Sequence, residues 1–250
     1  MDKIQKIKNE NKKIIGIWGY PDPVILQEVR DKFPRHEIID LDVNYNVPPS
    51  NILPDAYCKI ITNIIDNSIY LKENLETIVA SVGEEKCDAA RYAAAILNQL
   101  GLNIIQTTYI KYENLKSETP ISESNLPLKD KVIRIMDEIL YPKNVLIPKI
   151  KATMGFWGVP PNDIKLLELF PDSTHVFGWT RCVEAKRPAD MELEMFVDKN
   201  IPTVFFAQTF CAKMQLARYL AKKHNGLYVD VDDKASNSVR AKIEAFIRLG

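Results

Sequence analysis

The chain contains two copies of one sequence pattern, and this repeat limits the folds that it can adopt. The motif GIWGYP, which begins at Gly16, recurs as GFWGVP, which begins at Gly155. A second match follows in each copy, with the tripeptide ARY at 90–92 and again at 217–219. A long pattern that is present only twice predicts two similar lobes rather than a solenoid. Two lobes also predict a cleft between them, where a ligand would bind.

Both copies alternate short apolar runs with amphipathic segments, a pattern typical of buried strands followed by helices. The expected strands are 13–19, 36–43, 77–82 and 102–109 in the first copy, and 153–157, 174–179, 203–207 and 227–231 in the second. The expected helices are 24–33, 57–75, 84–100, 131–140, 163–170, 189–198, 212–223 and 238–247. Short connections between alternating strands and helices predict right-handed parallel β-α-β units. The predicted fold class is therefore α/β, with two Rossmann-like parallel-sheet lobes related by internal duplication.

The two copies are separated by a polar stretch with few large apolar side chains, which is typical of a linker. We therefore expect a first lobe at 1–113, a linker and connecting helix at 114–142, and a second lobe at 143–250. In open parallel sheets, ligands bind outside the carboxyl ends of the strands. This rule directs the search for site residues to the turns that follow the expected strands.

The composition excludes several classes of partner. The chain has 33 lysines and arginines and 33 aspartates and glutamates, so its formal net charge is zero. That balance argues against a nucleic-acid partner, which requires a basic surface. No apolar run approaches the roughly 20 residues that span a bilayer, and the start of the chain lacks the apolar centre of a secretory signal. We expect a cytoplasmic protein without a membrane partner, in which the four cysteines form no disulfide framework.

The turn after the first strand of each copy is a candidate ligand site, formed by Trp18, Gly19 and Tyr20 in one copy and by Trp157 and Gly158 in the other. Glycine permits close approach of the backbone, and the helix start that follows presents unpaired N–H groups to an anion. An exposed tryptophan would stack on a flat ligand; the alternative is that both tryptophans pack inside the lobes. Neither turn contains the dinucleotide fingerprint or a Walker motif.

The cysteines are candidate metal ligands. Cys182 is expected at the end of the second strand of the second lobe, Cys211 at a helix start after the third strand, and Cys87 in the equivalent turn of the first lobe. A helix N-terminus lowers the pKa of a thiol, and thiolates bind metals and iron–sulfur clusters. The alternative is that these thiols are buried packing residues, as we expect for Cys58.

Three polar residues complete the candidate site, namely Arg181, Glu184 and Thr209. The guanidinium of Arg181 suits a carboxylate or a phosphate, and the alternative is an ordinary solvated loop. No Ser-His-Asp or Cys-His arrangement is visible, so the sequence identifies no catalytic residue.

The segment 176–211 runs from a strand to a cysteine, then through a helix to the strand that begins IPTV at 201–204. In this order it resembles the 2-hydroxyacyl-CoA dehydratase subunit family. The resemblance implies an iron–sulfur cluster held by cysteines between Rossmann-like domains.

Two classes of function follow from these features. The first is an enzyme, or an enzyme-assembly factor, that binds a cysteine-ligated metal or iron–sulfur cofactor in the inter-lobe cleft. The second is a metal-free protein or transferase that binds a small anionic ligand in the same cleft. A structural subunit of a larger complex is a third alternative. The sequence leaves the reaction class undetermined, and it leaves open a homo-oligomer or a partner subunit.

Overall fold

The chain folds into two parallel α/β units. The computed structural model describes residues 3–108, 120–140, 147–188 and 190–249. The chain divides into two compact units, Met1–Ile110 and Lys111–Gly250, which are called unit 1 and unit 2 below. Each unit contains a four-stranded sheet in which every described strand pair is parallel. The α/β fold class, with two Rossmann-like parallel sheets, is therefore confirmed.

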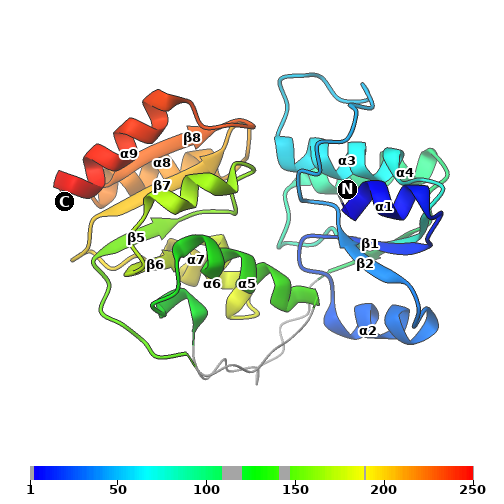
Figure 1. Cartoon of the computed structure of the whole chain (residues 1–250), viewed down its shortest axis with the longest axis horizontal. Helices are drawn as coiled ribbons and strands as arrows, with labels where there is room; N and C mark the ends of the chain where they lie inside the picture. Colours follow the sequence, from blue (N-terminus) through cyan, green and yellow to red (C-terminus); the bar gives the residue numbers. More distant parts are fainter. Residues whose placement is uncertain (1–2, 109–119, 141–146, 189, 250) are drawn as a thin grey trace. The chain divides into compact units, whose positions relative to one another are not determined.

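Unit 1 is a small doubly wound sheet. Its elements are α1 (Lys3–Asn9), β1 (Ile14–Trp18), α2 (Pro23–Lys32), β2 (Glu37–Asp40), α3 (Lys59–Tyr70), β3 (Leu75–Ser81), α4 (Asp88–Gln99) and β4 (Ile104–Thr107). The strand order is β2-β1-β3-β4. Figure 1 shows α2 on one face of this sheet and the neighbouring helices α3 and α4 on the other. The chain thus winds outward in both directions from β1 and β3, the two central strands.

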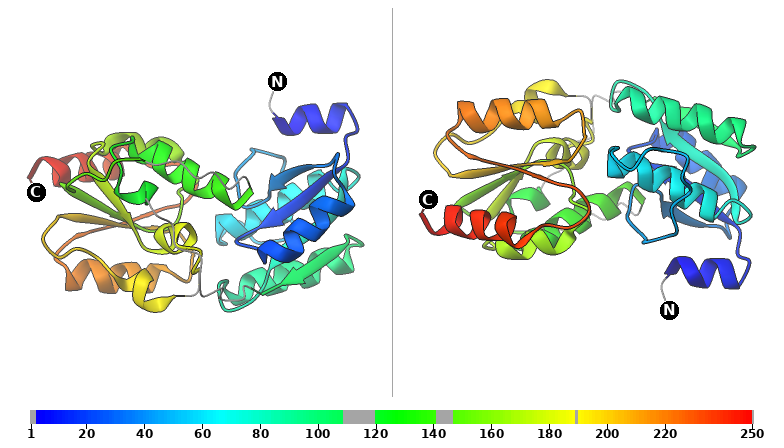
Figure 2. Two further views of the ribbon diagram at one scale, coloured as in Figure 1. Left: turned by 90° about the horizontal axis from the view of Figure 1, so that it is seen from below. Right: turned by 90° about the horizontal axis from the view of Figure 1, so that it is seen from above.

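Unit 2 repeats this order. Its elements are η1 (Ile121–Glu123), α5 (Leu128–Leu140), β5 (Met154–Trp157), η2 (Ile164–Leu169), β6 (Thr174–Phe177), α6 (Trp179–Glu184), α7 (Met191–Met195), β7 (Thr203–Gln208), α8 (Met214–Lys223), β8 (Leu227–Val231) and α9 (Asn237–Leu249). The strand order is β6-β5-β7-β8, which matches unit 1 strand for strand. In Figure 2, α8 and α9 lie on opposite faces of the second sheet.

The repeated glycines, Gly16 in β1 and Gly155 in β5, occupy equivalent crowded positions. A Cβ atom added to Gly16 in β1 would lie 2.7 Å from Leu41 Cδ1, and one added to Gly155 in β5 would lie 2.4 Å from Thr203 Oγ1. Contacts this short are not tolerated in close-packed interiors. The first half of the repeat therefore marks places where neighbouring side chains fill the space that a larger residue would need.

The second half of the repeat also marks equivalent environments. Ala90 in α4 and Ala217 in α8 are both fully buried, whereas Tyr92 and Tyr219, two positions further on, are both largely exposed. A helix that packs one face on a sheet buries its small residues there and leaves the opposite face in solvent. The duplication therefore extends from the strands into the helices that cover them.

A glycine closes the helix α4. Gly101 adopts φ +85°, and its N–H donates to the carbonyl of Asn98 at 2.9 Å. The N–H of Leu102 reaches back to the carbonyl of Leu97 at 3.1 Å. These two bonds form a Schellman motif, in which a left-handed residue satisfies the last free carbonyls of a helix.

The helix expected at 163–170 is instead the short 3₁₀ helix η2, so that prediction is wrong. The helix covers only the six residues IKLLEL, and Pro171 comes two residues after its last residue, Leu169. A residue before proline avoids the α conformation, and Phe170 is extended, with φ −91° and ψ 146°. The proline therefore prevents the helix from continuing through Phe170.

The strand expected at 174–179 ends earlier, at Phe177. Gly178 adopts φ +75°, a conformation that L side chains rarely take, and α6 begins at the next residue. Cys182 consequently lies inside the helix α6, and the expectation that it lies at the end of a strand is wrong.

Some expectations concern residues outside the described ranges. Within the expected linker 114–142, residues 114–119 and 141–142 are not described, and the same holds for residues 109 and 189 at the ends of expected elements. The described part of that linker contains η1 and the helix α5. Among the described residues, no helix is both long enough and apolar enough to cross a membrane.

Candidate functional site

The turn after β1 is bonded to the segments on both of its sides. Trp18 ends the strand, is fully buried, and its indole Nε1–H donates to the carbonyl of Ser81 at 3.0 Å. Gly19 follows with φ +69°, and its N–H donates to Asp42 Oδ2 at 2.8 Å. The end of β1 is thereby joined to the end of β3 and to the loop after β2.

Asp42 is held in place through its own backbone. Its N–H donates to Asp40 Oδ1 at 2.9 Å, and its carbonyl accepts from Asn63 Nδ2 at 2.9 Å. The neighbouring Asn67 donates to the carbonyls of Leu41 at 3.0 Å and of Val43 at 2.8 Å. Asparagine is a weak helix former, but here two asparagines in α3 fix the loop that carries the Asp42 carboxylate.

Lys86 forms an ion pair with this carboxylate. Its Nζ lies 3.3 Å from Asp42 Oδ2, and the two side chains are only 12% and 14% exposed. Burial lowers the pKa of Lys86, but the charges of Asp42, Asp40 and Cys87 and the hydrogen bond to Asp42 together raise it more, so that the pKa lies above its usual range. The ammonium is therefore charged at neutral pH and largely shielded from water.

The Lys86 side chain lies directly against the backbone of Gly19. A Cβ added at Gly19 would lie 2.2 Å from Lys86 Cε and 3.0 Å from Ser81 Cβ. Only glycine therefore leaves room for the lysine at this point. The nearest occupant is the end of a flexible side chain, so a movement of Lys86 would vacate most of the space over Gly19.

Two buried oxygens at this edge have no hydrogen-bond partner among the described residues. They are Asp42 Oδ1 and Ser81 Oγ, and Ser81 is fully buried. Buried polar atoms are nearly always hydrogen-bonded, because an unpaired one costs about 1–3 kcal/mol. These atoms indicate a place where a ligand or a water molecule would complete the bonding.

The helix start beside this turn is already occupied by a protein carboxylate. Asp22 is 2% exposed, and its Oδ1 accepts from the N–H of Val24 at 2.8 Å and of Ile25 at 3.3 Å. The N–H groups that we expected to receive a ligand anion are therefore capped from within the chain. In unit 2 the equivalent segment is η2, a 3₁₀ helix.

Unit 2 does not repeat this ion pair. Counting from the strand registers places Gly178 where unit 1 has Asp42, and counting from the repeated tripeptide ARY places Lys213 where unit 1 has Lys86. Glycine has no side chain, so Lys213 finds no carboxylate at that position and pairs instead with Glu194. The duplicated edge has therefore diverged in its chemistry.

The carboxyl end of β5 is closed by the chain itself. A Cβ added at Gly158 would lie 2.5 Å from the carbonyl oxygen of Phe206. The carbonyl of Gly158 accepts from both the N–H and the Oγ1–H of Thr180, at 3.2 and 2.9 Å. Backbone fills this place, in contrast to the flexible lysine of unit 1. Unit 1 therefore contains the better candidate site.

The tryptophans are packing residues. Trp18 and Trp157 are both fully buried, and the Trp157 indole Nε1–H donates to the carbonyl of Glu194 at 2.6 Å. The expectation of an exposed ring is wrong, and the packing alternative holds for both. Tyr20 is also buried, at 7% exposed.

The three candidate metal ligands lie in different environments. Cys182 is fully buried, its Sγ–H donates to the carbonyl of Asp190 at 3.7 Å, and burial together with the nearby Glu194 raises its pKa to about 12. It is therefore a thiol at neutral pH. Cys87 is exposed at the N-cap of α4, and Cys211 is partly exposed, three residues before α8 begins.

The residues around Cys182 do not fit a metal or an iron–sulfur cluster. Cys182 is fully buried and its thiol is hydrogen-bonded to the carbonyl of Asp190, so its sulfur is closed off by the protein. Within the part of the chain that the structure describes, no three His, Cys, Asp or Glu side chains gather to bind one metal ion. We derive no chemistry through such a group.

The remaining candidates make contacts within unit 2. The Glu184 carboxylate is 1% exposed, accepts from Arg181 Nη1 at 3.1 Å and from the N–H of Ser122 at 3.0 Å, and so ties η1 to α6. Burial raises the pKa of Glu184, and the Arg181 guanidinium opposes the rise. The N–H of Thr209 donates to the carbonyl of Val231 at 2.9 Å.

Sequence reasoning did not single out Asp42, Lys86 or Ser81. The available signal was a pair of acids at the end of the second strand, Asp40 and Asp42, at the edge where ligands of doubly wound sheets bind. No protein-family model matches the chain, and a search of curated proteins found no match. The geometry of the site alone therefore supports the functional conclusion.

Proposed function

We propose that the chain is a small-molecule-binding protein whose site lies at the carboxyl edge of unit 1, and that it takes an anionic ligand without a metal ion. The observation that carries this proposal is the shielded Asp42–Lys86 ion pair, 3.3 Å long, beside the end of β1. In doubly wound sheets, ligands bind where the chain turns outward in both directions from the central strands. In unit 1 this place is the end of β1 and β3.

Lys86 supplies the charge that attracts the ligand. An ammonium shielded from water acts more strongly on a nearby anion than a solvated one does, and Lys86 is only 12% exposed. Gly19 permits the ligand to approach the backbone, because the space over it is filled only by the lysine itself. The ligand therefore replaces Asp42 as the principal partner of Lys86, or shares the lysine with it.

The first class of function, an enzyme or assembly factor with a cysteine-bound cofactor, has weaker support from the described residues. Cys182, one of its three candidate ligands, is a buried thiol. That class predicts brown protein with bound iron after anaerobic purification, and stoichiometric iron would overturn the metal-free proposal.

Thermal unfolding in the presence of a chelator tests the proposal. Acetate, propionate and inorganic phosphate are added at about 10 mM against chloride of equal ionic strength, because a ligand that binds only the folded state raises Tm. We expect at least one anion to raise Tm of the wild type and to leave Tm of Lys86→Met unchanged. Lys129→Met is the matched control, since Lys129 pairs with Glu168 in unit 2 at 2.6 Å. An equal rise in both variants would refute the proposal.

A further inference from the structure

We infer that the ligand of unit 1 carries a hydrogen-bond donor beside its anionic group, as an α-amino or α-hydroxy carboxylate does. This inference rests on the proposed function and adds the chemical class of the ligand. It follows from the two oxygens of Asp42, which have different surroundings.

Asp42 places a negative charge beside the lysine. Asp42 Oδ2 accepts from the N–H of Gly19 and from Lys86, so the carboxylate is anchored within contact of the lysine that the ligand would use. An anion without a donor would place a second negative charge beside Asp42, and like charges repel strongly where water is excluded. A ligand with a donor replaces this repulsion by a hydrogen bond.

The second oxygen of Asp42, Oδ1, is a candidate acceptor for the ligand. Asp42 Oδ1 is buried and has no hydrogen-bond partner among the described residues. An ionised carboxylate can only accept, so the group that satisfies Oδ1 must be an N–H or an O–H. Ser81 Oγ, which is also without a partner there, lies on the next strand end and offers a second hydroxyl contact.

A ligand can reach this place only if Lys86 moves. Asp42 is fixed through its backbone by Asp40 and by Asn63. Lys86, by contrast, covers Gly19 only with the end of its side chain. Rotation of the lysine therefore opens the edge while the carboxylate stays in position. The resulting site presents an ammonium and a carboxylate side by side. This arrangement is complementary to a zwitterion and to a hydroxy acid.

Three probes with the same carbon skeleton test this class. Propionate has no donor, L-lactate has a hydroxyl donor, and L-alanine has an ammonium donor. With about 20 mM of each probe, we expect lactate or alanine to raise Tm of the full-length protein by about 2–4 °C and propionate to raise it less. 2-Methoxypropionate, in which a methyl group caps the hydroxyl of lactate and removes its donor, should behave as propionate does.

The variant Asp42→Asn should abolish the difference between lactate or alanine and propionate, because an amide replaces the accepting carboxylate at constant shape. The control Asp31→Asn alters an acid on the exposed side of α2 and should leave the difference unchanged. If lactate, alanine, propionate and 2-methoxypropionate all raise Tm equally, the inference fails while the anion site stands. If none of them and no other anion raises Tm, both fail. The comparison of lactate with 2-methoxypropionate needs no variant, so it decides the inference even if Asp42→Asn does not fold.

Discussion

The ammonium of Lys86 lies 3.3 Å from the carboxylate of Asp42, although the two residues are 44 positions apart in the chain. One follows β3 and the other follows β2, the two strands that flank β1. The pair therefore exists only because the doubly wound order brings these two loops to the same end of β1. Unit 2 has the same strand order but carries Gly178 where unit 1 has Asp42.

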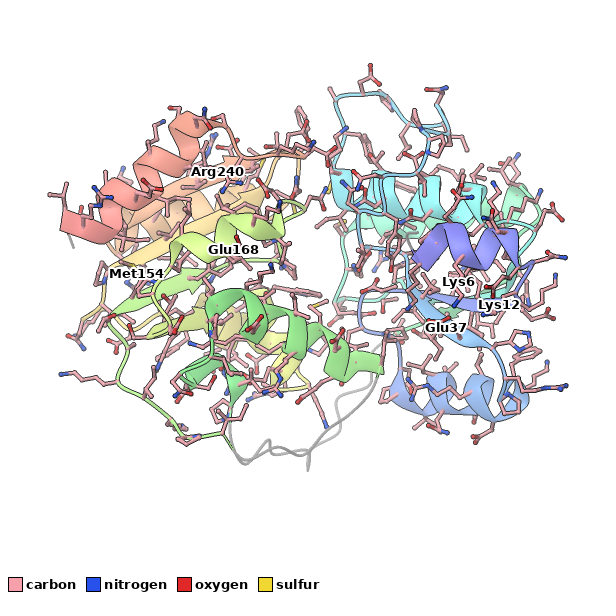
Figure 3. All side chains as sticks on the ribbon, in the orientation of Figure 1. Lys6, Lys12, Glu37, Met154, Glu168 and Arg240 are labelled. Atoms are coloured by element: carbon pink, nitrogen blue, oxygen red, sulfur yellow. The ribbon has the colours of Figure 1, made fainter. Side chains whose placement is uncertain are left out.

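The ion pair should be strongly coupled in a double-mutant cycle. We expect Asp42→Asn and Lys86→Met to show a coupling energy of about 1–3 kcal/mol in urea unfolding, because removing one partner leaves the other charge shielded and unpaired. The matched control is the pair of Lys3 with Glu37, the latter labelled at the start of β2 in Figure 3. These two side chains are 50% and 42% exposed, so their coupling should stay below about 1 kcal/mol. Equal coupling of the two pairs would contradict the burial of Asp42 and Lys86.

The fluorescence of the protein should report tryptophan rings that are shielded from solvent. All three tryptophans of the chain are buried, with Trp18 and Trp157 at 0% and Trp179 at 6% exposed. We expect a blue-shifted emission and little quenching by iodide in the native protein, with full quenching after unfolding. Quenching of the native protein at the level of free tryptophan would show that at least one ring is exposed, as a stacking role requires.

The cysteines should differ in reactivity. Cys87 is exposed and should react quickly with Ellman's reagent. Cys182 is fully buried with a pKa of about 12, so it should react only after unfolding, because the thiolate is the reacting form. Mass spectrometry of the labelled peptides measures both rates. Fast labelling of Cys182 in the native protein would restore it as a candidate ligand.

Lys131 should make stability depend on pH in the alkaline range. Its side chain is fully buried on α5, and its ammonium donates to the carbonyls of Asp172 and Thr174 at 2.7 and 2.6 Å. Burial lowers its pKa to about 8, against the opposing charge of Asp172, whereas the unfolded chain has a lysine pKa of about 10.4.

Between these two pKa values the unfolded chain binds more protons, so the free energy of unfolding rises with pH across that window. We expect the difference between the wild type and Lys131→Met to rise by at most about 3 kcal/mol between pH 7.5 and pH 10. Chemical denaturation at a series of pH values measures it. A flat or falling difference would show that the two carbonyls keep the ammonium charged.

The sequence predicted the fold where local patterns encode it. Apolar runs of strand length, alternating with amphipathic segments, were enough to predict both sheets. The helix α6 was missed, because it depends on the left-handed conformation of Gly178 rather than on any periodicity. The wrong position predicted for Cys182 has the same cause, because this residue lies in α6.

The site was predicted only in outline. The rule on carboxyl ends identified the turn at Gly19, but the ion pair joins two loops that no local pattern connects. The role of Asn63 and Asn67 could not be predicted for the same reason. Both side chains stabilise the loop after β2 by hydrogen bonds to its carbonyls. Residues that act across the sheet become visible only once the strand order is known.

Glycine NMR tests the central claim most directly, that unit 1 binds the anion and unit 2 does not. The chain has nine glycines, so selective ¹⁵N-glycine labelling gives a spectrum in which Gly19 can be assigned from a variant. The N–H of Gly19 donates to Asp42, and it should therefore shift saturably when L-lactate or L-alanine is added. Gly158, its counterpart in unit 2, is the internal control. A saturable shift at Gly19 with Gly158 unmoved is the predicted result; a shift at Gly158 alone, or no shift at Gly19 with any of the anions, would contradict the account.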